Sequence, residues 1–145
     1  MGSEVVPQPA GYSGTPLIQK LGIKKGFRIK LINAPDDYFE LVANLPDSVV
    51  FENDRSEDLD LIHFFTKQAD EYYKQLPVMK QQIKPNGSIW ASWPKKSSKV
   101  VTDITEDIIR NYAIAAGLVD IKVCAINEIW SGLKLVIPVV KRAAD

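Results

Sequence analysis

The segment 88–99 joins an apolar run to a concentrated positive charge. It reads SIWASWPKKSSK, with three lysines after a tryptophan and a proline and no acidic residue among them. Ammonium groups, together with the hydroxyl and backbone donors of neighbouring serines, are the groups that bind oxyanions. An indole ring beside them offers a flat apolar face to a planar ligand. The segment therefore predicts a site for a small anionic ligand at Trp93, Lys95, Lys96, Ser97 and Ser98.

The same residues have a simpler interpretation. Lysines in a loop are usually solvated, and Glu106 and Asp107 already occupy the start of the helix expected next. For Trp93, packing against a helix is the favoured alternative. A binding loop and a solvated loop stay open as alternatives.

Two other polar residues are expected where strands end. Asn33 follows the apolar segment 27–32, and Glu52 follows the segment 48–51. Ligands of open α/β sheets gather beyond the carboxyl ends of the strands, so both residues join the candidate ligand site. At the end of the second strand an acid can bind a ribose, and a solvated loop residue is the alternative.

The remaining chemically active residue types give no catalytic or metal centre. His63 is the sole histidine and lies within LDLIHFFT, which predicts a core residue. Cys124 is the sole cysteine and lies in an apolar strand, where a thiol is usually inert. One histidine and one cysteine cannot form the common zinc sites or a disulfide framework. We predict no catalytic residue, no metal and no bound cofactor.

Strands and helices alternate along the chain. Strands are expected at 27–35, 48–52, 59–66, 88–93, 119–130 and 133–141, and helices at 16–21, 36–46, 67–83 and 105–117. Pro77 should break or kink the third helix, Ser131 and Gly132 should form the last hairpin turn, and Pro138 suggests an edge or a bulge. This order predicts an α/β fold, with a mostly parallel sheet, helices on both faces and a C-terminal antiparallel hairpin.

Two resemblances follow from longer phrases. The element order over roughly residues 23–141 and the phrase IKPNGSIWAS resemble the Rossmann-like class I methyltransferase fold. The phrases GYSGTPLIQKLGIKKG, WPKKSSKVVTDITED and GLVDIKVCAINEIWSGLK resemble a bacterial domain-of-unknown-function family of small proteins with a WPKK motif. The first resemblance implies an S-adenosylmethionine site with a glycine-rich turn after the first strand. INAPDDY stands there instead, and no glycine occurs between Gly26 and Gly87.

The bulk composition limits the class of protein. The 145 residues are 46% hydrophobic, which suits one α/β domain at 15–145 behind a flexible N-terminal arm at 1–14. Eighteen basic residues balance eighteen acidic ones, so the chain as a whole has no charge reason to bind nucleic acid or an anionic membrane. No apolar run is long enough to span a membrane, and we expect a cytoplasmic protein.

Together these observations favour a non-catalytic methyltransferase-like domain. We expect it to bind a small anionic ligand or a protein partner at the carboxyl edge of the strands. A transferase with an atypical S-adenosylmethionine or nucleotide site is the alternative. A nucleic-acid binder is a third hypothesis, supported only by the lysines and neighbouring tryptophans of segment 88–99.

Overall fold

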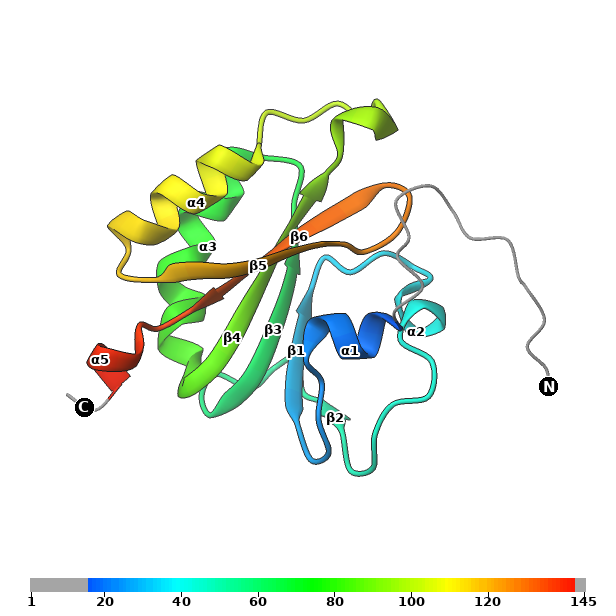
Figure 1. Ribbon diagram of the computed structural model, residues 1–145, viewed down its shortest axis with the longest axis vertical. Helices are drawn as coiled ribbons and strands as arrows, with labels where there is room; N and C mark the ends of the chain where they lie inside the picture. The colour runs from blue at the N-terminus through cyan, green and yellow to red at the C-terminus, as the bar shows by residue number, and fades with distance from the viewer. Residues whose placement is uncertain (1–15, 143–145) are drawn as a thin grey trace.

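The computed structural model describes residues 16–142, so the predicted arm at 1–14 lies outside the described residues. Within that range a six-stranded sheet carries helices on both faces (Figure 1). The strands are β1 (Arg28–Ile32), β2 (Val50–Phe51), β3 (Leu59–Phe65), β4 (Ile83–Pro94), β5 (Val119–Ala125) and β6 (Trp130–Val136). The helices are α1 (Leu17–Leu21), α2 (Tyr38–Leu41), α3 (Ala69–Gln82), α4 (Glu106–Ala115) and α5 (Val139–Arg142), with a 3₁₀ turn at Lys96–Ser98.

The strand order confirms the predicted α/β fold. The order across the sheet is β2-β1-β3-β4-β6-β5, and the first four of these strands are parallel. β6 runs antiparallel to both of its neighbours, β4 and β5, so β5 points the same way as β1 to β4. Because parallel strands end at the same edge, the ends of β1, β3 and β4 share one edge of the sheet, here called the rim.

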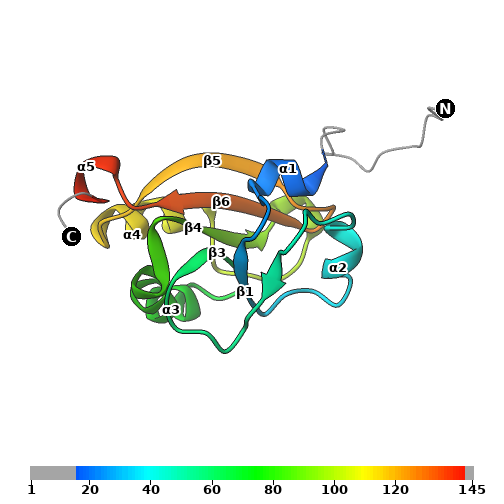
Figure 2. The same cartoon turned by 90° about the horizontal axis from the view of Figure 1, so that it is seen from below.

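Two apolar layers cover the sheet because successive side chains of a strand point to opposite faces. Ile89, Ala91 and Trp93 of β4 pack beneath α3 and α4. The alternate residue Trp90 packs in the other layer, with α1 and α2. Figure 2 shows the sheet edge-on, with α1 beside β5 and β6 and α3 on the opposite side. The two layers therefore lie on opposite faces of the sheet.

A buried chain of polar side chains ties α2 to the centre of the sheet. His63 of β3 is fully buried, with its Nδ1 2.8 Å from the Tyr38 hydroxyl and its Nε2 2.9 Å from Ser92 Oγ. Burial lowers the pKa of His63 to about 3, so the ring is neutral at physiological pH. Both ring nitrogens have partners, which satisfies the imidazole inside the core. The prediction of a core histidine is confirmed.

Of the break or kink predicted at Pro77, the break does not occur. α3 runs through Pro77, which has no N–H to give to the carbonyl of Tyr73 four residues earlier. The hydroxyl of Tyr112, from α4, donates to that carbonyl over 3.1 Å. A side chain from the neighbouring helix thus replaces the missing helical hydrogen bond.

The predicted turn of the last hairpin is also wrong. The turn lies at 126–129, where Asn127 Oδ1 accepts from the N–H groups of Ile129 and Trp130 over 2.9 and 2.8 Å. Ser131 and Gly132 lie inside β6. A Cβ at Gly132 would lie only 3.0 Å from Ser92 Oγ, so this glycine serves close packing and not a turn.

Two further boundaries differ from the sequence expectation. Pro138 follows the end of β6, and β6 is an interior strand, so the predicted edge or bulge at Pro138 is wrong. Residues 84–87, which fall between the expected helix at 67–83 and the expected strand at 88–93, belong to β4, where the pairing with β3 is irregular between Leu59 and Leu61. The extra residues are accommodated as a bulge.

Candidate functional site

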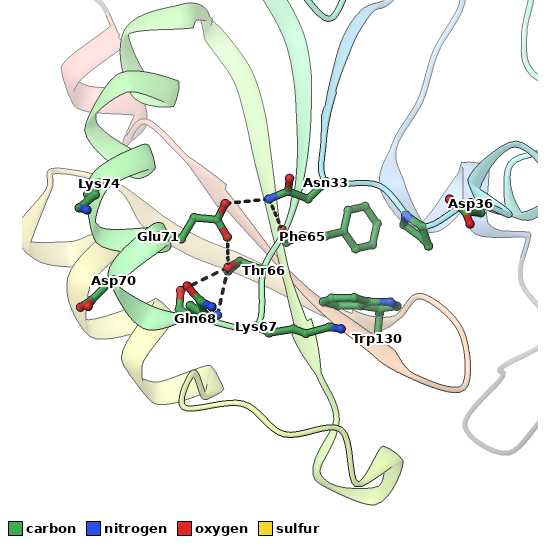
Figure 3. A pocket seen from close by; sticks show the side chains of 11 residues that line it. Asn33, Asp36, Phe65, Thr66, Lys67, Gln68, Asp70, Glu71, Lys74 and Trp130 are labelled. Atoms are coloured by element: carbon green, nitrogen blue, oxygen red, sulfur yellow. Dashed lines mark hydrogen bonds between the residues drawn. The ribbon is translucent and has the colours of Figure 1, made fainter.

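An open cavity of about 900 Å³ lies at the rim (Figure 3). It is here called the rim cleft. Its position follows from the parallel strands, because chain segments distant in sequence meet where those strands end. Its lining comes from the ends of β1 and β3, the start of α3 and the start of β6: Asn33, Pro35, Asp36, Phe65, Thr66, Lys67, Gln68, Asp70, Glu71, Lys74 and Trp130.

A network of three side chains fixes the polar part of the cleft. The amide Nδ2 of Asn33 donates to Glu71 Oε2 over 2.9 Å and to the carbonyl of Phe65 over 3.1 Å. The hydroxyl of Thr66 donates to the other carboxylate oxygen of Glu71. Asn33 sits at φ 59°, a left-handed conformation that asparagine tolerates better than most residues. The network therefore holds the ends of β1 and β3 against the first turn of α3.

Two aromatic side chains form the apolar wall. Trp130 and Phe65 pack edge to face, with ring centroids 5.1 Å apart and an interplanar angle of 88°. Trp130 is 8% exposed, and the side-chain bonds of Asn127 fix its backbone at the start of β6. Because Trp130 is both held and partly accessible, it can present apolar ring surface to a ligand in the cleft.

Charged side chains of both signs stand around the opening. Figure 3 shows the Lys67 side chain extending toward Trp130, with Asp70 and Lys74 on the far side of the cleft along α3. The loop before α4 holds the Lys67 backbone, because the Thr102 hydroxyl donates to the Lys67 carbonyl over 2.7 Å. Asp103 accepts from the N–H of Ala69 over 2.8 Å, which caps α3. The connection from β3 to α3 is thus anchored to the loop before α4.

The structure brings Asn33 into the rim cleft but leaves Glu52 outside it. β2 pairs only with the first half of β1, so Glu52 stands below the level of Asn33. Its Oε1 lies 3.6 Å from Arg28 Nε and 3.8 Å from Arg55 Nη1. Glu52 is therefore engaged by two guanidinium groups at the side of the sheet.

The predicted residues of segment 88–99 lie at the same rim, outside the cleft. Trp93 is 8% exposed and belongs to the layer beneath α3 and α4. Lys96 and Trp93 line a separate cavity of about 530 Å³, together with Glu106 and Asp107. The hydroxyl of Ser98 donates to the Lys95 carbonyl over 2.6 Å, and Ser97 is exposed. A ligand-binding role for Trp93, Lys95, Lys96, Ser97 and Ser98 stays a prediction.

Sequence reasoning missed most of the cleft lining. Thr66 ends a predicted strand, which is the one local signal that could have placed it at the rim. Glu71 is indistinguishable in sequence from an ordinary first-turn acid of a helix. Trp130 was expected at the end of a strand, before a turn at Ser131 and Gly132. Because Trp130 in fact begins β6, the sequence did not indicate that it lines the cleft.

The chain does not supply the usual contacts for S-adenosylmethionine. The turn after β1 is Asn33-Ala34-Pro35-Asp36, so side chains stand where a glycine-rich turn would leave the backbone open. Glu52, the acid at the end of β2, does not line the cleft. These residues do not fit the cofactor in its usual mode.

Neither a metal site nor a membrane-spanning helix is found among residues 16–142. No group of three or more His, Cys, Asp or Glu side chains between residues 16 and 142 is arranged to hold a metal ion. None of the helices in that range has the length and apolar character needed to cross a membrane.

Comparisons with known proteins show the fold and the family. No curated protein sequence matches the chain. Solved structures similar to it include a SAM-dependent methyltransferase from Aquifex aeolicus (14% identity, TM-score 0.58, covering 84% of this chain and 88% of that one). Another is a possible type 11 methyltransferase from Sulfolobus solfataricus (16% identity, TM-score 0.60, covering 83% and 89%). A third is magnesium protoporphyrin IX methyltransferase from Synechocystis with bound SAH (10% identity, TM-score 0.52, covering 84% and 78%).

Identities this low show a methyltransferase-like fold and nothing finer. The family described as "Protein of unknown function (DUF3052)" matches residues 18–139, which is most of the chain. The match confirms the sequence resemblance to a domain-of-unknown-function family, and the chain belongs to that family.

Proposed function

We propose that the protein is a non-catalytic, methyltransferase-like domain that binds a small anionic ligand with a planar ring in the rim cleft. The observation that carries this proposal is the cleft itself. Its volume of about 900 Å³ is within the range of small-molecule sites, and it combines an aromatic wall with fixed polar groups. A cytoplasmic location accompanies the proposal as a prediction.

The lining suggests how such a ligand would lie. The ring would pack against Trp130, whose backbone is held in place. The anionic group would meet the ammonium of Lys67, which extends toward the tryptophan (Figure 3). Both donors of the Asn33 amide are used within the protein, so Asn33 offers its oxygen as an acceptor for a ligand N–H.

A non-catalytic role is supported by the chemistry of the lining. Both oxygens of Glu71 accept hydrogen bonds from neighbouring side chains, so this carboxylate is a structural acceptor and is poorly placed to move a proton. The turn after β1 lacks the glycines that bring a backbone against S-adenosylmethionine. We therefore propose that the fold keeps a ligand cleft without methyl transfer.

Calorimetry with three related probes tests the proposal. Adenosine diphosphate carries the ring and the charge, adenosine carries only the ring, and pyrophosphate carries only the charge. We expect saturable binding of adenosine diphosphate, weakened about tenfold by Lys67→Gln because one charge-assisted contact is lost. Lys141→Gln, on α5, is the matched control and should bind as the wild type does.

Two results would overturn the proposal. One is that none of the three probes binds saturably, which would favour a protein partner at the rim. The other is a Lys67→Gln variant that binds adenosine diphosphate as tightly as the wild type, which would place the ligand elsewhere.

The second candidate is a transferase that holds S-adenosylmethionine or a nucleotide in an atypical way. The specific observation in its favour is that the cleft of this methyltransferase-like fold lies at the carboxyl ends of parallel strands. Calorimetry with S-adenosylmethionine, followed by transfer of a labelled methyl group to an acceptor in a lysate, tests this candidate. Methyl transfer by the wild type that is lost in Trp130→Ala would replace the non-catalytic proposal. If S-adenosylmethionine does not bind, this candidate is excluded.

A further inference from the structure

Lysine side chains gather on the α1 face of the sheet, away from the rim. Lys122 of β5 and Lys134 of β6 share this face with Lys24, which follows α1, and these three residues are here called the lysine cluster. The ammonium of Lys122 donates to the carbonyl of Lys20 over 3.1 Å. The ammonium of Lys134 lies over Gly22, where an added Cβ would be 3.2 Å from it.

The strand register places two of these charges against each other. Lys122 and Lys134 are directly opposite partners in the antiparallel pair of β5 and β6. Like charges in this position are destabilising. Burial lowers the pKa of Lys134, and the neighbouring Lys122 and Lys24 lower it further. The fold therefore holds these ammonium groups together against their repulsion.

Within the described residues, no carboxylate lies within 4.0 Å of the ammonium groups of the lysine cluster. Between residues 16 and 142, the ion pairs within 4.0 Å involve Arg28, Arg55, Lys84 and Arg110 as the cations. No acidic residue occurs in segment 16–35. Asp120, on the same strand as Lys122, pairs with Arg110 of α4 on the other face. The repulsion within the lysine cluster is thus not offset by an ion pair in this part of the chain.

A structural role accounts for only part of the arrangement. Lys122 caps a carbonyl near the end of α1, which is a common use of lysine. Lys134 makes no hydrogen bond or ion pair within residues 16–142, yet it is half-buried beside the capping lysine. A bound oxyanion would accept hydrogen bonds from the Lys134 ammonium and would also reduce its repulsion with Lys122.

We propose that the lysine cluster is a binding site for a phosphate-type oxyanion, separate from the rim cleft. The ligand chemistry is a compact group with two negative charges, either free or as part of a small metabolite. Lys134 lies four residues along β6 from Trp130, which is about 13 Å in an extended strand. The inference does not depend on the proposed function of the rim cleft.

Thermal unfolding with pyrophosphate as the probe tests this inference, with sodium chloride at the same ionic strength as the reference. The wild type should melt several degrees higher in pyrophosphate than in the chloride reference. The double variant Lys122→Gln/Lys134→Gln should lose that shift. The matched double variant Lys80→Gln/Lys141→Gln, which removes two lysines from α3 and α5, should keep it.

Three outcomes would overturn the inference. The first is a pyrophosphate shift no larger than the chloride effect, and the second is a full shift in the Lys122→Gln/Lys134→Gln variant. The third is a salt-sensitive electrophoretic shift of duplex DNA without any effect of pyrophosphate, which would assign the cluster to a nucleic-acid backbone. If the double variant does not fold, a pyrophosphate titration of the wild type must move the amide resonances of Gly22 and Lys134, and unmoved resonances contradict the inference.

Discussion

The rim cleft and the lysine cluster use charge in opposite ways. In the cleft, the polar side chains engage one another, as in the contact of Asn33 with Glu71, and the lining includes both lysines and acids. In the lysine cluster, Lys122 faces Lys134 across two strands with no carboxylate beside them among the described residues. The cleft is thus organised before a ligand arrives, whereas the cluster would be stabilised by its ligand. Substitutions should therefore have opposite signs in the two regions.

The largest effect is expected at the wall of the cleft. Trp130→Ala removes a buried ring that packs on Phe65, and it should lower the free energy of unfolding by about 3–5 kcal/mol. It should also abolish binding of adenosine diphosphate. Urea denaturation and calorimetry measure the two effects. Trp130→Phe is the control, because it keeps an aromatic wall and should lose less stability and less affinity. Unchanged affinity in Trp130→Ala would mean that the ligand does not contact this wall.

The core beneath the cleft should lose stability in acid. His63 has a pKa of about 3 in the folded protein and an ordinary value of 6.5 when unfolded. Between those values the unfolded chain binds a proton that the folded protein does not, so stability falls as the pH falls from 6.5 toward 3. The slope should approach 1.4 kcal/mol per pH unit, that is about 2 kcal/mol between pH 6.5 and pH 5. Urea denaturation of the wild type against His63→Gln isolates this effect, and equal slopes in the two proteins would refute it.

A smaller loss is expected in the polar floor of the cleft. Glu71→Ala leaves donors of Asn33 and Thr66 without their shared acceptor, which should cost about 1–2 kcal/mol and loosen the ends of β1 and β3. Asp70→Ala is the matched control, because Asp70 occupies the same first turn of α3 but is exposed. Chemical denaturation of both variants measures the difference. A loss in Asp70→Ala equal to that in Glu71→Ala would mean that the helix end, and not the network, is responsible.

In the lysine cluster the expected effect is small and has the opposite sign. Lys134→Gln should raise the free energy of unfolding by about 0.5 kcal/mol without added phosphate, because a like-charge pair is removed. The pKa of Lys134 is lowered in the folded protein, so the folded protein releases this proton first as the pH rises. The wild type should therefore approach the variant in stability toward pH 10.5. Denaturation curves at several alkaline pH values measure this, and a destabilised variant would contradict the repulsion.

Local patterns were sufficient to predict most elements of the fold. Thr105 was expected to begin a helix, and its side chain accepts from the N–H of Ile108 over 3.2 Å at the start of α4. The last hairpin was misplaced because a serine and a glycine are typical of a turn. Gly132 is required instead by Ser92 and Trp90, which are distant in the sequence and invisible to a local pattern.

The site could be predicted only at the level of strand ends. Asn33 was expected at the rim because it follows an apolar run, and the structure places it in the cleft. Its partner Glu71 is 38 residues away, and nothing in the local pattern indicates that contact. Glu52 was expected beside Asn33 because it also follows an apolar segment. The length of β2 and its register with β1, which place Glu52 outside the cleft, cannot be deduced from sequence.

The indole resonances of the tryptophans test the claim of a ligand in the rim cleft most directly. Trp130 lines the cleft, whereas the indole N–H of Trp90 is buried and donates to the Leu21 carbonyl over 3.0 Å. In a nitrogen–proton correlation spectrum titrated with adenosine diphosphate, the Trp130 resonance should move saturably. The Trp90 resonance, which lies beside Gly22 and Lys134, reports separately on the lysine cluster. A Trp130 resonance that does not move, while the amide resonances of Gly22 and Lys134 do, would contradict the assignment of the rim cleft as the ligand site.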